Sequence, residues 1–101
     1  MEKEKCEELI GKLSEIRNAI NNSRRLTKNT KDKNVIKRAK YDSEVNALKG
    51  RNLIESDEEL REVFLSGKDP VSRAESLRDL INPDYCENDI ALLIEKIKTL
   101  S

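Results

Sequence analysis

The chain of 101 residues contains no histidine and no tryptophan, and it has only three aromatic residues, two cysteines and three glycines. A cysteine nucleophile would lack an imidazole base, and a closed zinc site would lack ligands. Few aromatic side chains leave no stacking platform for single-stranded nucleic acid. The glycines are isolated and form no phosphate-binding loop. We therefore expect no enzyme activity, no metal site and no cofactor.

Two cysteines, Cys6 and Cys86, are too few for the disulfide framework of a small secreted protein. Both fall on apolar stripes, so we expect them to act as small buried hydrophobes. A disulfide between them would require the starts of two helices to lie side by side. No run approaches the roughly 18 apolar residues of a membrane span, and the first ten residues lack the apolar segment of a signal peptide. These features favour a soluble, cytoplasmic protein, whether cellular or viral.

Charge is what the chain has in excess, because charged residues make up 40% of it and hydrophobic residues 36%. An average domain is about 25% charged. The aliphatic residues recur at regular intervals, which disordered chains do not show. We predict a single all-α domain over residues 1–101. It is expected to be a small bundle of about five helices, with two long N-terminal helices, two short ones and a long C-terminal one.

Two apolar stripes, one at each end of the chain, define the expected core. In residues 82–100 the stripe consists of Cys86, Ile90, Leu93, Ile97 and Leu100, widened by Leu92 and Ile94. In residues 3–21 it consists of Cys6, Leu9, Leu13, Ile16 and Ile20. Alternating spacings of three and four place each set on one helix face. Either the two stripes pack together within one monomer, or one stays partly open for a partner helix or a second copy.

A second long helix is predicted over residues 31–54, after a polar, basic connection at about 22–33 in which only Leu26 could be buried. Thr30 is the candidate N-cap of this helix. One quarter of its circumference carries mostly small residues: Ile36, Ala39, Ser43, Ala47, Gly50 and Ile54. Bulkier residues lie roughly opposite: Tyr41, Val45 and Leu48. We expect the helix to sit between two neighbours, with the small face allowing close backbone approach.

Local signals mark the boundaries of the remaining helices. Ser56 and Glu59 have the spacing of a capping box, and Gly67 suits a left-handed helix end. The dipeptides Asp69-Pro70 and Asn82-Pro83 each start a helix, with proline at the first helical position. The expected inner face of the fourth helix consists of Val71, Ala74, Leu77 and Ile81, with Leu80 beside it.

The net charge is zero, but the charges are segregated along the chain. The basic run, which holds one acid, Asp32, contains Arg24, Arg25, Lys28, Lys31, Lys33, Lys37, Arg38 and Lys40. The acidic run contains Glu55, Asp57, Glu58, Glu59 and Glu62, with one base, Arg61. Adjacent acids at a helix start are favoured by the helix dipole. The segregation predicts a dipolar molecule, and both runs are candidate partner-binding sites.

These features predict a small helical protein-interaction module, acting as adaptor, regulator or inhibitor of a protein partner through a charged surface. In size and charge the chain resembles, in a general way, small helical adaptors, subunits, immunity factors and inhibitors, many of them encoded by viruses or plasmids. One alternative is binding of nucleic acid, without sequence preference, through the basic run. Another is a structural subunit of a homo-oligomer. We expect no membrane partner and no small-molecule substrate.

Overall fold

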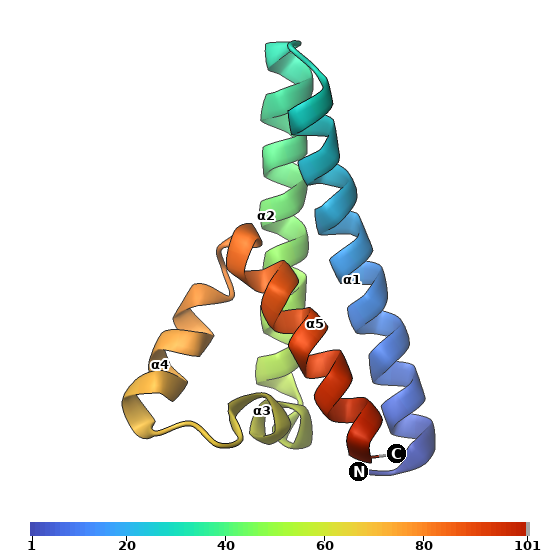
Figure 1. Cartoon of the computed structure of the whole chain (residues 1–101), viewed down its shortest axis with the longest axis vertical. Coiled ribbons are helices and arrows are strands. Elements are labelled where there is room, and N and C mark those ends of the chain that lie inside the picture. The colour runs from blue at the N-terminus through green and yellow to red at the C-terminus, as the bar shows by residue number, and fades with distance from the viewer. Residues whose placement is uncertain (101) are drawn as a thin grey trace.

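The computed structural model describes residues 1–100, and these residues form five helices and no strand. The helices are α1 (Lys3–Asn29), α2 (Lys33–Ser56), α3 (Glu58–Leu65), α4 (Pro70–Asp79) and α5 (Pro83–Leu100). Helices α1 and α2 form a long antiparallel hairpin, and α5 packs along its lower part (Figure 1). The predicted all-α bundle, with its order of long and short helices, is confirmed.

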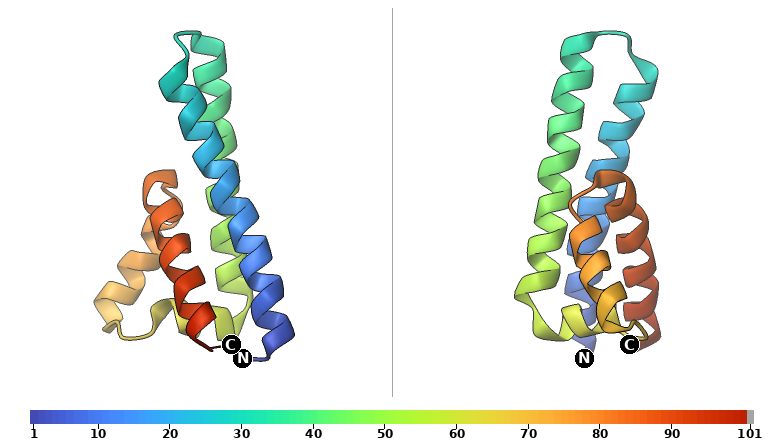
Figure 2. Two further views of the ribbon diagram at one scale, coloured as in Figure 1. Left: turned by 45° about the vertical axis from the view of Figure 1, so that its right-hand side comes forward. Right: turned by 90° about the vertical axis from the view of Figure 1, so that its left-hand side faces the viewer.

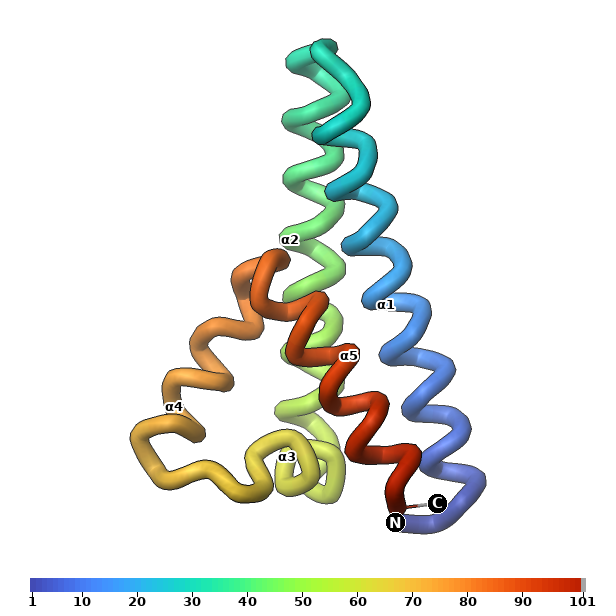
Figure 3. The backbone as a smooth tube through the Cα atoms, viewed as in Figure 1, coloured from blue at the N-terminus to red at the C-terminus, as the bar shows by residue number. Residues whose placement is uncertain are grey.

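The hairpin is longer than the helix that covers it. The molecule measures 44 × 31 × 19 Å, and the hairpin lies along the long axis (Figures 1 and 2). Both views show that the distal end of the hairpin extends beyond the first turn of α5 with no third helix against it. We call residues 25–40 the hairpin tip. The start of α1 and the end of α5 lie together at the opposite end of the molecule (Figure 3).

The core forms where the two apolar stripes meet the small face of α2. Its largest fully buried side chains from the three long helices are Leu13, Ile20, Ile54, Ile90, Leu93 and Ile97. The two stripes therefore pack together within one monomer, which was the first of the two alternatives drawn from the sequence. Leu92 and Leu100 depart from the expectation, because they are 58% and 50% exposed. Leu92 follows Ile90 by two residues and so falls on the outer side of α5.

Gly50 marks the closest approach among the three long helices. A Cβ atom built at this glycine would lie 3.0 Å from Ile90 Cδ1 of α5, 3.5 Å from Cys86 Sγ and 3.5 Å from Ile16 Cγ2 of α1. Side chains from two neighbouring helices thus occupy the space in which any other residue would place its first carbon. The small face of α2 packs as the sequence predicts.

The opposite side of α2 does not pack against a second layer. Tyr41 and Leu48 are 66% and 50% exposed, and Val45 is half-buried. The expectation that α2 separates neighbours on opposite sides is wrong. Both α1 and α5 reach α2 on its small-residue side, because side chains this small leave room for two helices on one face.

The connection between α1 and α2 is shorter than the sequence indicates. Helix α1 runs to Asn29, so the segment expected to connect at about 22–33 is largely helical, and α2 starts at Lys33. Asp32, rather than Thr30, is the N-cap of α2 and accepts from the backbone N–H of Asn34 at 2.9 Å. Burial of Ser23 between the long helices favours helix where the local polar sequence favours a loop.

The caps of the short helices agree with the sequence in all but one case. Asp57, rather than Ser56, caps α3 and accepts from the N–H of Leu60 at 3.1 Å. Gly67 has φ +77°, the left-handed conformation expected at the end of α3. Asp69 caps α4, with Pro70 in the first helical position. Helix α5 begins at Pro83, as predicted.

Helix α4 forms an outer arm, and its expected inner face is only partly correct: Leu77 is half-buried and packs against the core, but the other members of that face are exposed. Val71 is 68% exposed, Ile81 is 49% exposed, and Ala74 is also exposed. No residue within α4 is buried, although Leu80 immediately after it is fully buried. The ion pair of Arg73 with Glu62, at 3.6 Å, links the start of α4 to α3, and Leu77 and Leu80 attach the other end to the core.

Candidate interaction surface

The acidic run is used largely within the protein, beginning with Asp57 and Glu59. The carboxylate of Asp57 accepts from Lys5 Nζ of α1 at 3.1 Å and caps α3. Hydrogen bonding from the Leu60 backbone N–H and from Lys5 lowers the pKa of Asp57. Glu59 lies 3.3 Å from the same lysine. These contacts hold the start of α3 against the start of α1.

Two further acids of the run also have basic neighbours. Glu55 pairs with Arg51 at 3.0 Å, and Glu62 pairs with Arg73 at 3.6 Å. Glu58 is exposed and has no ion pair among residues 1–100. Exposed ion pairs contribute little stability, yet they cancel the local field. The structure thus leaves little of the acidic run as an unpaired negative face.

The basic run behaves differently, because most of it is solvent-exposed at the hairpin tip. The exposed members, none of which has an ion pair within the described residues 1–100, are Arg25, Lys28, Lys31, Lys33, Lys37, Arg38 and Lys40. The only acid of the tip is Asp32, whose carboxylate is engaged at the N-terminus of α2. Residues 25–40 therefore carry seven positive side chains and one negative one, a net charge of +6, and the neutral total leaves −6 for the remainder.

Arg24 is the exception within the basic run. It forms ion pairs with Glu87 and, at 3.3 Å, with Asp84, both in the first turns of α5. Arg24 thus fastens α5 to α1 at the base of the tip. Sequence reasoning placed it with the free cations, because its partners lie some sixty positions away along the chain.

Apolar side chains are exposed among the basic ones, and sequence reasoning did not single them out as a site. Leu26, in the last turns of α1, is 53% exposed, and Val35, in the first turn of α2, is 37% exposed. Tyr41, next to Lys40, is 66% exposed. The tip therefore offers aliphatic as well as positively charged contacts. The sequence could have indicated this surface, because these apolar residues belong to none of the apolar stripes predicted to form the core.

The thiols are placed for packing. Cys6 and Cys86 are both free and buried, as expected, and Cys86 Sγ lies 3.8 Å from the carbonyl oxygen of Ala47. Burial, with a contribution from the charge of Asp89, raises the pKa of Cys86 to about 12. The thiol of Cys86 is therefore protonated at neutral pH and inaccessible to solvent.

The structure defines the class of molecule as an all-α protein built on a helical hairpin with a basic tip. None of the helices within residues 1–100 combines the length and the apolar character needed to cross a membrane. No family model, curated protein or solved structure matches this chain.

Proposed function

We propose that this protein is a cytoplasmic, non-catalytic interaction module whose hairpin tip binds an acidic surface of a protein partner. One observation carries the proposal: cations of the tip have no partners within the described chain, while most acids of the acidic run do. A positive patch of this kind speeds association with an oppositely charged protein and selects that partner. The module would act as an adaptor, regulator or inhibitor.

The composition of the tip favours protein over nucleic acid as the partner. Leu26 and Val35 stand exposed between the cations, and aliphatic side chains contribute to binding when a partner covers them with its own apolar surface. A phosphate backbone offers charge but no such surface. Basic and aliphatic contacts together match the mixed core and rim of a protein interface.

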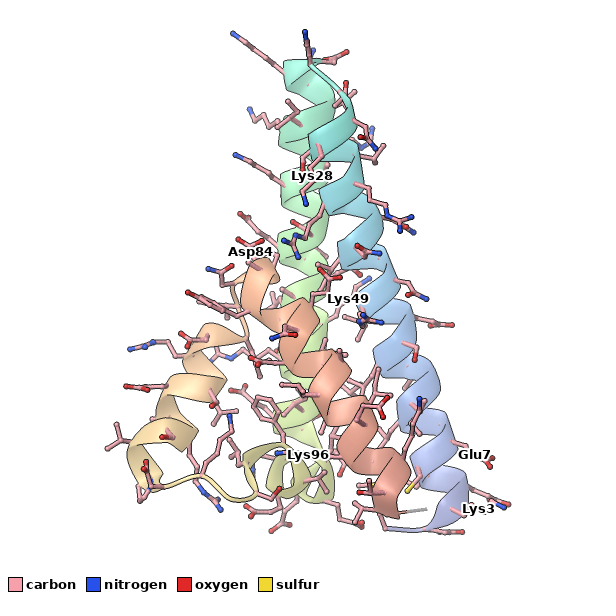
Figure 4. The ribbon with its side chains drawn as sticks, viewed as in Figure 1. Lys3, Glu7, Lys28, Lys49, Asp84 and Lys96 are labelled. Atoms are coloured by element: carbon pink, nitrogen blue, oxygen red, sulfur yellow. The ribbon has the colours of Figure 1, made fainter. Side chains whose placement is uncertain are left out.

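The test compares two charge-reversal variants of equal charge. The tip variant carries Lys33→Glu and Lys37→Glu, both on α2, and the control carries Lys3→Glu on α1 and Lys49→Glu on α2, both at exposed positions. Figure 4 shows Lys3 at the end of the molecule opposite the tip. Binding partners are captured from host extract with each protein, identified by mass spectrometry, and their affinities are then measured with purified protein. We expect the tip variant to lose the partner and the control to retain it. Equal retention by both would reject the assignment.

Arg24 is unsuited to this test, although it belongs to the basic run. Its reversal to glutamate would set three carboxylates together at the start of α5, because Asp84 and Glu87 lie beside it. A loss of binding would then reflect displacement of α5 as well as loss of surface charge.

Nucleic acid is the second candidate, and the net charge of the tip is the observation that favours it. Labelled duplex DNA and RNA are titrated at low and at moderate salt, where phosphate-driven binding must weaken steeply as salt rises. A Leu26→Ser variant separates the two candidates, since it should weaken the binding of a protein partner and leave the binding of nucleic acid through its phosphates unchanged. A homo-oligomer is tested by light scattering, where a mass of 11.6 kDa at every concentration rules it out.

A further inference from the structure

A polar pocket of about 390 Å³ lies at the base of the hairpin tip, where the first turn of α5 meets α1 and α2. Small hydroxyl side chains from the two long helices, Ser23, Thr27 and Ser43, line it. Pro83 and Asp84 of α5 close one side. Figure 4 shows Lys28 on α1 above Asp84 at the start of α5, on the same side of the molecule. The volume lies within the range of small-ligand sites, roughly 300–1,000 Å³.

Ser23 is the unusual residue of this pocket. It is only 8% exposed, and its hydroxyl has no hydrogen-bond partner among the described residues. The neighbouring hydroxyls are engaged, because Thr27 donates to the carbonyl of Arg24 at 2.7 Å and Ser43 donates to that of Lys40 at 2.8 Å. No side-chain oxygen in the described chain is both sealed from solvent and unbonded, so the Ser23 hydroxyl opens into the pocket that it lines. The Ser23 hydroxyl is therefore free to donate a hydrogen bond to whatever occupies the pocket, whether water or a ligand.

Two lysines border the same space. Lys28 comes from α1 and Lys40 from α2, and neither is ion-paired within residues 1–100. Arg24 also lines the pocket but is held by Asp84 and Glu87. The first turn of α5 adds the positive end of its helix dipole. Two lysines without ion pairs and an unbonded hydroxyl thus line one cavity, and ammonium and hydroxyl groups are the donors that suit a phosphate dianion.

The carboxylate of Glu44, which also lines the pocket, narrows the class of ligand. A bare anion would be repelled by it, whereas a ligand with an amino or hydroxyl group beside its phosphate would donate to it. The volume likewise exceeds the space that a phosphate group alone would fill. We propose that this pocket binds a small phosphomonoester that carries a hydrogen-bond donor near the phosphate, with Ser23, Lys28 and Lys40 holding the phosphate and Glu44 the donor. Lys28 and Lys40 also belong to the hairpin tip, so the pocket adjoins the surface proposed for the protein partner, but the proposal for the pocket does not rest on that partner.

The first experiment maps binding by amide chemical shifts in a ¹⁵N-labelled full chain, at constant ionic strength. The probes are O-phospho-L-serine, inorganic phosphate and L-serine. We expect O-phosphoserine to shift the amides around residues 23–28 and 40–44, to bind more tightly than inorganic phosphate, and to leave residues 31–37 unshifted. L-Serine should cause no shift. Shifts spread evenly over the tip, or none up to about 10 mM O-phosphoserine, would overturn the proposal.

The second experiment uses variants that remove one donor at a time. Ser23→Ala should weaken O-phosphoserine about tenfold or more, because it deletes a hydrogen bond to a charged group without changing the net charge. Lys28→Gln and Lys40→Gln should weaken it similarly, whereas Lys31→Gln, the matched control at the connection, should change affinity less than about twofold. Circular dichroism confirms that each variant is folded. An unaffected Ser23→Ala variant, or equal losses with Lys31→Gln, would show that only the general charge of the tip attracts the ligand.

Discussion

Replacement of Gly50 by alanine tests the packing on which the fold depends. The added methyl group would lie 3.0 Å from Ile90 Cδ1, closer than carbon atoms normally approach. Ile90 is fully buried, so its terminal methyl can yield only by displacing other core side chains. The substitution Ile90→Val should remove this clash, because valine lacks the Cδ1 atom that the new methyl group would contact.

The expected free energies of unfolding follow from opposing terms. Alanine in place of glycine inside a helix gains about 1 kcal/mol, while overpacking a core costs about 1–3 kcal/mol. Gly50→Ala alone should therefore lower stability by up to about 2 kcal/mol. Ile90→Val alone should lower it by about 0.5–1.5 kcal/mol. In the double variant the clash is absent and the helix gain remains, so its stability should return close to that of the parent protein.

The assay is urea unfolding of the parent, both single variants and the double variant, followed by far-ultraviolet circular dichroism. The control is Gly11→Ala in α1, where the new methyl group would meet nothing within 4 Å beyond its own turn of helix, so stability should rise by up to about 1 kcal/mol. Non-additivity of at least about 1 kcal/mol is expected between positions 50 and 90. Effects that add to within about 0.3–0.5 kcal/mol would refute the contact.

Three further predictions concern single residues. Gly67→Ala should lower stability by about 1 kcal/mol, measured by urea unfolding, because Gly67 has φ +77°. The thiol of Cys86, buried and with a pKa of about 12, should react with an aromatic disulfide reagent only after the protein is denatured; rapid reaction of the native protein would contradict this. Asp57→Ala should cost about 1–2 kcal/mol at neutral pH by loss of the α3 cap. Because the folded protein lowers the pKa of Asp57, the advantage of the parent is present above the unfolded pKa, near 4, and should disappear as the pH falls through the folded value, as thermal unfolding at a series of pH values would show.

Local sequence chemistry predicted those features of the fold that local chemistry controls. Asp69 caps α4 and Gly67 adopts the left-handed conformation because each acts on backbone groups within a few residues. The apolar stripes could also be predicted from the sequence, since their spacing is set by the pitch of the helix. The end of α1 could not be predicted. Ser23 is helical because it packs against residues distant in the sequence, and the polar local sequence does not indicate this packing.

The sequence predicted which basic residues belong to the candidate surface, but not which of them are free of ion pairs within the fold. The sequence shows eight basic residues between Arg24 and Lys40, but only the fold reveals that Arg24 meets Glu87, and that Lys5 meets Asp57. These pairs join positions more than fifty residues apart, and helix periodicity contains no information about them. The pocket around Ser23 could not be predicted from the sequence for the same reason, since its lining residues come from three helices.

The position of the positive charge follows from the unequal lengths of the helices. Helix α1 has 27 residues and α2 has 24, whereas α5 has 18, so at about 1.5 Å per residue α5 is about 14 Å shorter than α1 and about 9 Å shorter than α2. Apolar side chains can be covered only along the length that α5 spans. Beyond it the hairpin must be solvated on nearly all sides, which requires charged residues. Helix α3 lies at the end of the molecule opposite the tip, and α4 lies beside the lower half of the hairpin (Figure 1). A neutral chain thus becomes a dipolar molecule, because most acids of the acidic run pair with basic residues from α1, α2 and α4, whereas the tip cations form no ion pair within residues 1–100.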